Sequence, residues 1–111
     1  MEINFANEKL GQDINDAKRL LTRYGQQRAK ILRRRLDDLR AAATLDIMRT
    51  LPGRCHELSG DRKNQLSLDL DGPYRLIFCP NHMPMPRKPD GGLDWCEVKQ
   101  ITILEITDTH K

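Results

Sequence analysis

The chain has 111 residues, of which 38% are hydrophobic and 32% charged, and its formal net charge is +3. This length suits one compact domain spanning residues 1–111. No apolar run approaches the roughly 20 residues that a membrane span requires. The first residues also lack the basic segment and apolar block of a signal peptide. We therefore expect a cytoplasmic, single-domain protein.

The positive charge is concentrated in the first half of the chain. Residues 1–50 carry eleven basic and seven acidic side chains, whereas residues 51–111 carry eight and nine. Such an excess favours a polyanion or an acidic partner. The three cysteines, Cys55, Cys79 and Cys96, form no C-x-x-C pair. We therefore expect three reduced thiols, and neither a disulfide framework nor a metal or other cofactor.

The first half of the sequence predicts a strand followed by a helical hairpin. Residues 2–6 alternate polar and apolar side chains, as in a short strand, and a polar break follows at residues 7–9. Apolar residues then recur at helical spacing over residues 13–24, with Asp13 as N-cap. Gly25 separates this helix from a second one over residues 26–43. The apolar stripe of the second helix comprises Ala29, Leu32, Leu36 and Leu39.

The second half of the sequence predicts an antiparallel meander. After a short helical turn from Thr44 and the breaker Leu51-Pro52-Gly53, the hydrophobic period changes from helical to two. The expected strands cover residues 55–58, 65–70, 74–79 and 97–107. Asp71-Gly72 is a hairpin signal, and residues 80–94, with four of the six prolines, are expected to form a long exposed loop.

The last strand has apolar residues of both parities, which indicates a central strand covered on both faces. The fold class is therefore α+β, with an N-terminal strand and a helical hairpin packed on a small, mainly antiparallel sheet.

The candidate chemistry lies between Leu51 and Phe78 and at the end of the chain. His56 occupies a short strand, and Arg62 and Lys63 follow in a polar turn. Arg75 interrupts an apolar strand, where arginine is rare unless it is paired or functional. Two interpretations of Arg75 stay open: a salt bridge to Asp69 or Asp71 across the hairpin, or anion binding.

A second histidine, His110, directly follows the last strand. His56 and His110 together could form an acid/base pair for RNA cleavage, with one imidazole taking the proton of a 2′-hydroxyl and the other protonating the leaving oxygen. Arg75, Arg62 or Lys63 would stabilise the charge that develops on the phosphate. Each histidine taken alone is a weak signal.

The helix over residues 26–43 contains Arg33-Arg34-Arg35. The run is either a solvated helix face or a contact to the RNA backbone, for which Arg33 and Arg34 are the candidate residues.

The motif Leu-x4-His-x-Leu-x-Gly-Asp-Arg-x4-Ser-Leu, then Asp-Gly-x-Tyr-Arg-Leu-Ile-Phe, resembles the HigB branch of the RelE/ParE toxin superfamily. The final Ile-Leu-Glu-Ile-Thr-Asp-x-His is similar to the Asp-Tyr-His ending of that branch. The resemblance covers residues 51–78 and 101–110. One position differs, because the family has tyrosine where this chain has Thr109.

The resemblance implies a RelE-like fold and a type II toxin that cleaves messenger RNA in the ribosomal A site, by attack of a 2′-hydroxyl on the adjacent phosphate. It implies a cognate helix-turn-helix antitoxin, HigA-like, and contact with operator DNA only through that antitoxin. The family's catalytic positions fall on His56, Arg75, Asp108 and His110, and phosphate contacts fall on Arg62 or Lys63.

Two alternatives remain on the sequence alone. The same fold serves ParE-like gyrase inhibitors, which need no acid/base pair, so fold does not decide between them. Thr109 also leaves open an inactive relative that keeps only antitoxin binding.

Overall fold

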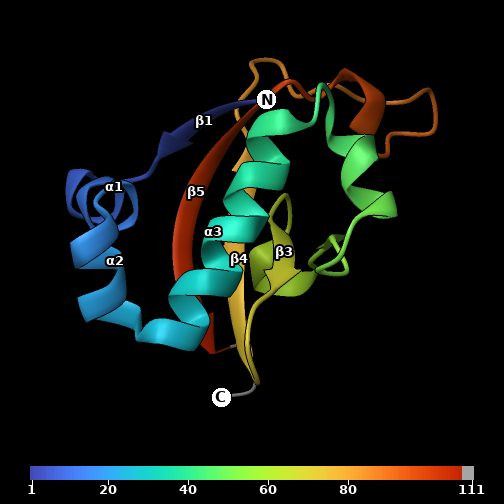
Figure 1. The fold of residues 1–111 in the computed structure, drawn as a ribbon. Helices are drawn as coiled ribbons and strands as arrows, with labels where there is room; N and C mark the ends of the chain where they lie inside the picture. Colours follow the sequence, from blue (N-terminus) through green and yellow to red (C-terminus); the bar gives the residue numbers. More distant parts are fainter. Residues whose placement is uncertain (109–111) are drawn as a thin grey trace.

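The computed structural model describes residues 1–108, which build one five-stranded mixed sheet in the order β1-β5-β4-β3-β2 (Figure 1). β1 (Glu2–Phe5) runs parallel to β5 (Gln100–Asp108). β2 (His56–Glu57), β3 (Leu66–Asp69) and β4 (Tyr74–Pro80) continue the sheet with antiparallel pairing. The predicted α+β class and the mainly antiparallel sheet are confirmed.

The helical layer contains three α-helices, α1 (Glu8–Asn15), α2 (Ala17–Tyr24) and α3 (Gln26–Ala41), rather than the predicted two. The polar break predicted at residues 7–9 is wrong. Asn7 is instead an N-cap, whose side chain accepts a hydrogen bond from the Leu10 amide.

Asp13 is not an N-cap but lies inside α1, where it is buried. The boundary between α1 and α2 is Asp16, whose extended backbone ends one helix. Its side chain accepts hydrogen bonds from the amides of Lys18 and Arg19, so the same residue starts the next helix.

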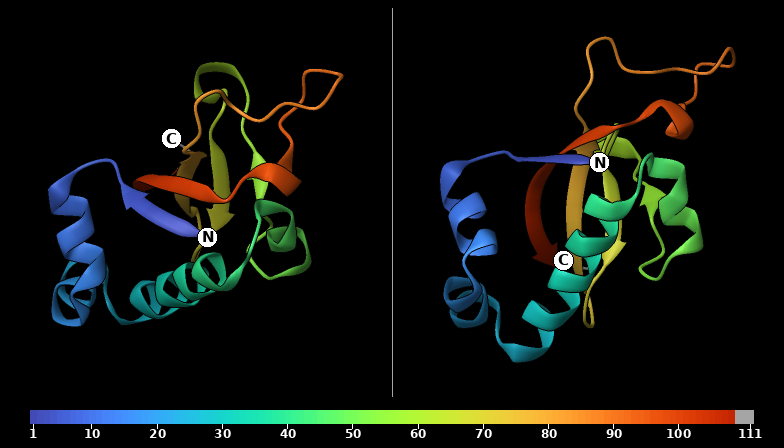
Figure 2. Two further views of the ribbon diagram at one scale, coloured as in Figure 1. Left: turned by 90° about the horizontal axis from the view of Figure 1, so that it is seen from above. Right: turned by 45° about the horizontal axis from the view of Figure 1, so that its top comes forward.

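α3 lies across one face of the sheet and supplies most of the helical contribution to the core (Figure 2). All four residues of the predicted stripe are buried. They join a cluster with the sheet side chains that alternate toward the same face, since successive residues of a strand point to opposite faces. These are Leu66, Leu68, Leu76, Phe78, Ile101 and Ile103.

Three 3₁₀-helices complete the structure: η1 (Leu45–Thr50), η2 (Gly60–Arg62) and η3 (Trp95–Glu97). The predicted loop over residues 80–94 does not stay on the surface throughout, because Leu93 is buried. The predicted turn at Asp71-Gly72 joins β3 to β4 through a hydrogen bond from the Leu70 amide to the Tyr74 carbonyl.

β5 is central in the sheet, as predicted, but the expectation that it is covered on both faces is wrong. The pairing with β4 shifts between Phe78, opposite Ile103, and Ile77, opposite Glu105. Leu104 is therefore the extra residue of a β-bulge. Every side chain after it points to the face opposite the one that it would have in a regular strand. Because of the bulge, Ile101, Ile103 and Ile106 all lie on one face although their positions differ in parity. Glu105 and Thr107 lie partly exposed on the other face.

Within residues 1–108, no helix has both the length and the apolar character to cross a membrane.

Candidate functional site

The sheet face opposite α3, called the rear face below, carries most of the predicted chemistry. Residues paired directly across neighbouring strands point to the same side. His56 pairs with Ser67, Ser67 with Ile77, and Ile77 with Glu105. The adjacent row contains Asp69, Arg75 and Thr107. His56 and Arg75 therefore share this face on β2 and β4, whose separation is about 10 Å by strand spacing.

Asp69 is the electrostatic centre of the rear face, because two arginines hold its carboxylate. Arg75 Nε lies 2.9 Å from Asp69 Oδ1. Arg54 Nε donates to Asp69 Oδ2 at 3.0 Å, and Arg54 Nη2 donates to Oδ1 at 3.3 Å. The hydrogen bond to Asp69, and then its negative charge, raise the pKa of the Arg54 guanidinium.

Arg75 is built into the hairpin. Its side chain is only 11% exposed, and Nη1 donates to the carbonyls of Gly72 and Tyr74 at 2.9 and 2.8 Å. Of the two interpretations of Arg75 from the sequence, the structure thus shows the salt bridge to Asp69. Asp71 is not its partner, since Asp71 binds Arg28 Nε at 2.9 Å on the other side of the hairpin.

The ring of His56 is oriented by the backbone next to it. His56 Nδ1 lies 2.8 Å from the Arg54 carbonyl oxygen. A carbonyl only accepts hydrogen bonds, so Nδ1 carries the proton. In the neutral ring Nε2 then keeps its lone pair. The carbonyl is positioned by two consecutive residues in left-handed backbone, Gly53 with φ of 113° and Arg54 with φ of 51°.

Arg62 reaches the rear face from η2, on the connection between β2 and β3. Figure 2, left, shows this connection on the side of the sheet away from α3. Arg62 Nη1 donates to Gln65 Oε1 at 3.0 Å and to Glu105 Oε2 at 3.3 Å. Lys63 follows as the C-cap residue of η2 and is exposed.

The remaining predicted site residues do not join this group. Asp108 pairs with Tyr74, so it belongs by register to the row on the helix-covered face, at the end of β5. Arg33 and Arg34 are exposed residues of α3, on the opposite layer. His110 and Thr109 lie outside the described residues.

Sequence reasoning missed the role of Arg54 and the position of Glu105. The Pro-Gly pair before Arg54 indicated a turn. It did not indicate that Arg54 adopts a left-handed backbone conformation or that its carbonyl oxygen contacts His56. Glu105 was hidden by the bulge at Leu104, because a regular strand places it on the other face.

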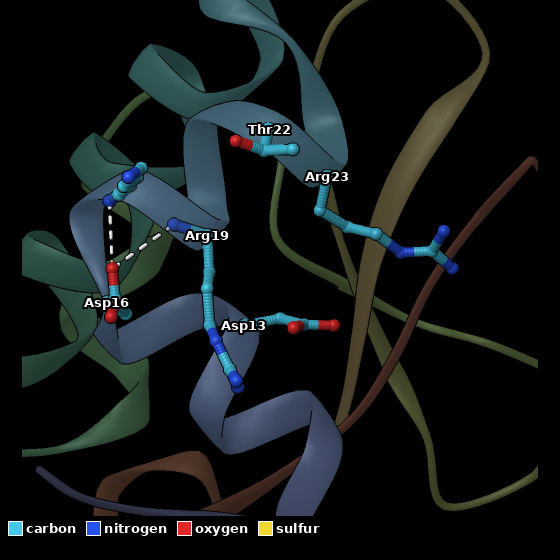
Figure 3. A pocket seen from close by; sticks show the side chains of 6 residues that line it. Asp13, Asp16, Arg19, Thr22 and Arg23 are labelled. Carbon is cyan, nitrogen blue, oxygen red and sulfur yellow. Dashed lines mark hydrogen bonds between the residues drawn. The ribbon is translucent and has the colours of Figure 1, made fainter.

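A separate cavity of about 610 Å³ lies at the junction of α1 and α2 (Figure 3). Asp13, Asp16, Arg19 and Arg23 line it. Its carboxylates already have partners: Asp16 caps α2, as drawn in Figure 3, and Asp13 Oδ2 is 3.0 Å from Lys9 Nζ. Both carboxylates of this cavity are therefore already engaged within the protein.

The rear face combines one imidazole that has an available nitrogen with several guanidinium groups. An imidazole can accept a proton at one ring nitrogen and donate one from the other, and guanidinium groups can stabilise an oxyanion. In the part of the chain that the structure describes, no group of three or more His, Cys, Asp or Glu residues is arranged to hold a metal ion.

No protein-family model and no curated protein sequence matches the chain.

Proposed function

We propose that the protein is an RNA-cleaving toxin of the HigB-like branch, with a RelE-like fold, which acts in the cytoplasm on messenger RNA in the ribosomal A site. The observation that carries this proposal is the position of His56. Its Nε2 is available on the same face as Arg54, Arg62 and the Asp69–Arg75 pair. Cation-lined imidazoles are suited to phosphodiester chemistry.

The proposed reaction is transesterification. The 2′-oxygen attacks the adjacent phosphorus, the bond from phosphorus to the 5′-oxygen breaks, and the products are a 2′,3′-cyclic phosphate and a 5′-hydroxyl. A base takes the 2′-hydroxyl proton, and an acid protonates the 5′-oxygen. His56 Nε2 serves one of these roles, and His110 is the candidate for the other.

The cationic roles divide according to how each arginine is held. Arg75 is almost fully engaged by Asp69 and two carbonyls, so it fixes the geometry of the site. Arg54 is 67% exposed and Arg62 is 36% exposed, so both can turn toward a phosphate from their present carboxylate partners. Lys63 adds charge at the edge of the site.

The test is growth after induction of the chain in the absence of any antitoxin, with mapping of 5′-hydroxyl ends on ribosome-bound messages. We expect growth arrest and cuts inside codons, and we expect His56→Ala to abolish both. His82→Ala is the matched control. His82 lies in the loop after β4, so this variant should leave cleavage intact. Full toxicity of His56→Ala would refute the assignment.

A second candidate is binding without cleavage, either to gyrase or to an antitoxin alone. The engagement of Arg75 by Asp69 favours it, since this arginine is then not available to a phosphate. DNA breaks after induction, with no cuts in messages, would support the gyrase reading. Lack of any toxicity would support an inactive, antitoxin-binding relative.

A further inference from the structure

The register of β2 and β3 brings Arg54 opposite Asp69. His56 lies opposite Ser67 in this antiparallel pair, and the same register, continued two residues further along each chain, joins Arg54 to Asp69. Opposed residues in an antiparallel pair alternate between those that exchange two hydrogen bonds and those that exchange none. A hydrogen-bonded pair therefore predicts hydrogen bonding at every second pair along the strands.

The observed hydrogen bonds depart from this alternation at Arg54. The amide of Leu58 donates to the Gln65 carbonyl at 2.9 Å, and this pair lies four residues away on each strand. In regular pairing the Asp69 amide would therefore donate to the Arg54 carbonyl. It donates instead to the Gly53 carbonyl, at 2.7 Å. Gly53 and Arg54 thus share one partner, which is the arrangement of a β-bulge.

The bulge releases the Arg54 carbonyl oxygen from the sheet. This oxygen lies 2.8 Å from His56 Nδ1, so the ring uses an acceptor that a regular strand would have given to Asp69. The backbone permits this exchange, because Gly53 and Arg54 both have positive φ and left-handed backbone is typical of one class of bulge. The contact between His56 and Arg54 is therefore a consequence of the bulge.

Asp69 holds the bulge from two sides. Its amide donates to the Gly53 carbonyl, and its carboxylate accepts hydrogen bonds from the Arg54 guanidinium at 3.0 and 3.3 Å. Arg75 in turn fixes that carboxylate, with Nε 2.9 Å from Oδ1. The Asp69 carbonyl accepts from Arg35 Nε at 2.8 Å, which fixes the main chain of Asp69 as well. A continuous set of contacts thus leads from Arg75 through Asp69 to Arg54.

We propose that Asp69 is a positioning residue for His56: by holding the bulge at Gly53 and Arg54, it keeps the imidazole proton on Nδ1 and the lone pair on Nε2. In water, a histidine side chain without a partner favours the proton on Nε2, so the bulge imposes the other tautomer. The inference rests on the proposed function for its consequence, since Nε2 of a neutral ring can take the proton of a 2′-hydroxyl only in this tautomer.

Heteronuclear NMR of the full chain, labelled with a heavy isotope of nitrogen, measures the tautomer. In alkaline solution the imidazoles are neutral, and the shifts of the two ring nitrogens give the ratio of Nδ1–H to Nε2–H. The chain has three histidines, and single histidine-to-alanine variants assign their signals. His82 is an internal reference, because its Nε2 accepts from two backbone amides and its proton therefore lies on Nδ1.

The key pair of variants is Asp69→Ala and Asp71→Ala. Each removes a carboxylate that holds an arginine on the same hairpin, but Asp71 binds Arg28 on the other side of that hairpin. We expect the ratio in the parent protein to favour Nδ1–H. Asp69→Ala should lower it about threefold to fivefold, as for the loss of one weak contact, while Asp71→Ala and the His82 signals should remain unchanged.

Two further variants locate the contact through which Asp69 acts. Arg54→Ala keeps the carbonyl that contacts His56 but loses the guanidinium that Asp69 holds. It should lower the ratio as much as Asp69→Ala does, and the double variant should lower it no further, because both changes remove the same link. Asp69→Asn retains an oxygen for Arg54 and should keep the ratio close to that of the parent.

Three outcomes would overturn the proposal: a parent ring with its proton on Nε2, an unchanged ratio in Asp69→Ala, or an equal loss in Asp71→Ala. Thermal unfolding checks that the variants fold, and Arg54→Ala, at an exposed side chain, carries the same test if Asp69→Ala does not. The measurements need no RNA. A parent protein that cleaves RNA, with an unchanged ratio in Asp69→Ala, would refute the positioning role and leave the proposed function intact.

Discussion

Asp69 and Arg75 lie directly opposite each other on β3 and β4, with Arg75 Nε 2.9 Å from Asp69 Oδ1. Because Arg75 is also bonded to two carbonyls, we expect Arg75→Gln to lower the free energy of unfolding by about 1–3 kcal/mol. Arg54→Gln, which loses an exposed partner of the same carboxylate, should cost less.

Urea unfolding of Arg75→Gln, Asp69→Asn and the double variant measures the coupling between the two residues. We expect a coupling energy of about 1 kcal/mol between Asp69 and Arg75. Additive losses would mean that the pair contributes nothing beyond its separate contacts.

Gly53 is a position at which both backbone and space require glycine. Its φ is 113°, and an added Cβ would lie 2.7 Å from Arg35 Nε and 3.0 Å from Leu68 Cδ2. Moving Arg35 would break its hydrogen bond to the Asp69 carbonyl. Gly53→Ala should therefore lower the free energy of unfolding by about 2–4 kcal/mol.

Gly60→Ala and Gly72→Ala are the controls for that prediction. Both glycines have positive φ, of 64° and 53°, but an added Cβ meets nothing within 4 Å. Each variant should lower the free energy of unfolding, measured by denaturant titration, by only about 1 kcal/mol. If all three variants lose the same stability, the close contact at Gly53 is irrelevant.

The three thiols should react with iodoacetamide in a definite order. Burial raises the pKa of the Cys55 thiol to about 12, against the lowering effect of Arg49. At pH 8 its thiolate fraction is then about one in ten thousand. Burial also raises the pKa of the Cys79 thiol.

Cys96 is exposed, and the charge of Asp46, followed by desolvation, raises the pKa of its thiol. Because solvent exposure of the thiol affects the reaction rate more than its pKa does, Cys96 should be modified first and Cys55 last. Mass spectrometry of timed samples measures this order. In denaturant the three rates should converge, and a fast Cys55 in the native protein would contradict the burial.

His82 anchors the loop that follows β4. Its Nε2 accepts hydrogen bonds from the amides of Lys99 and Gln100, at 3.0 and 3.3 Å. His82→Ala should therefore increase hydrogen exchange at these two amides, because they lose their acceptor at the start of β5. His56→Ala serves as the comparison, and unchanged exchange in His82→Ala would show that the contact has no energetic weight.

The sequence was most informative where one local rule acted alone. The stripe Leu32, Leu36 and Leu39 follows helical spacing, and it is buried as that spacing predicts. It was least informative where one residue has two roles. Asp16 ends α1 and caps α2. The helical spacing of apolar residues continues across this boundary, so the spacing alone does not show that one helix ends and another begins.

The same limit applies to the site. Strict alternation along β3 and β4 predicts that Asp69 and Arg75 lie on the face opposite the leucines, and the structure agrees. Arg54 could not be predicted as the partner of His56, because the contact uses its carbonyl oxygen and depends on a left-handed backbone.

The bulge at Leu104 also determines how tolerance to substitution should vary along β5. Before it, the even-numbered positions Gln100 and Thr102 face away from the core, and after it the odd-numbered Glu105 and Thr107 do so. Deleting Leu104 would remove the extra residue, and Glu105 and Ile106 would keep their present faces because Ile103, Glu105 and Ile106 would then alternate regularly. β5 can therefore accept polar substitutions at even-numbered positions before Leu104 and at odd-numbered positions after it, and Leu104 is the position where the loss of one residue preserves the strand pairing.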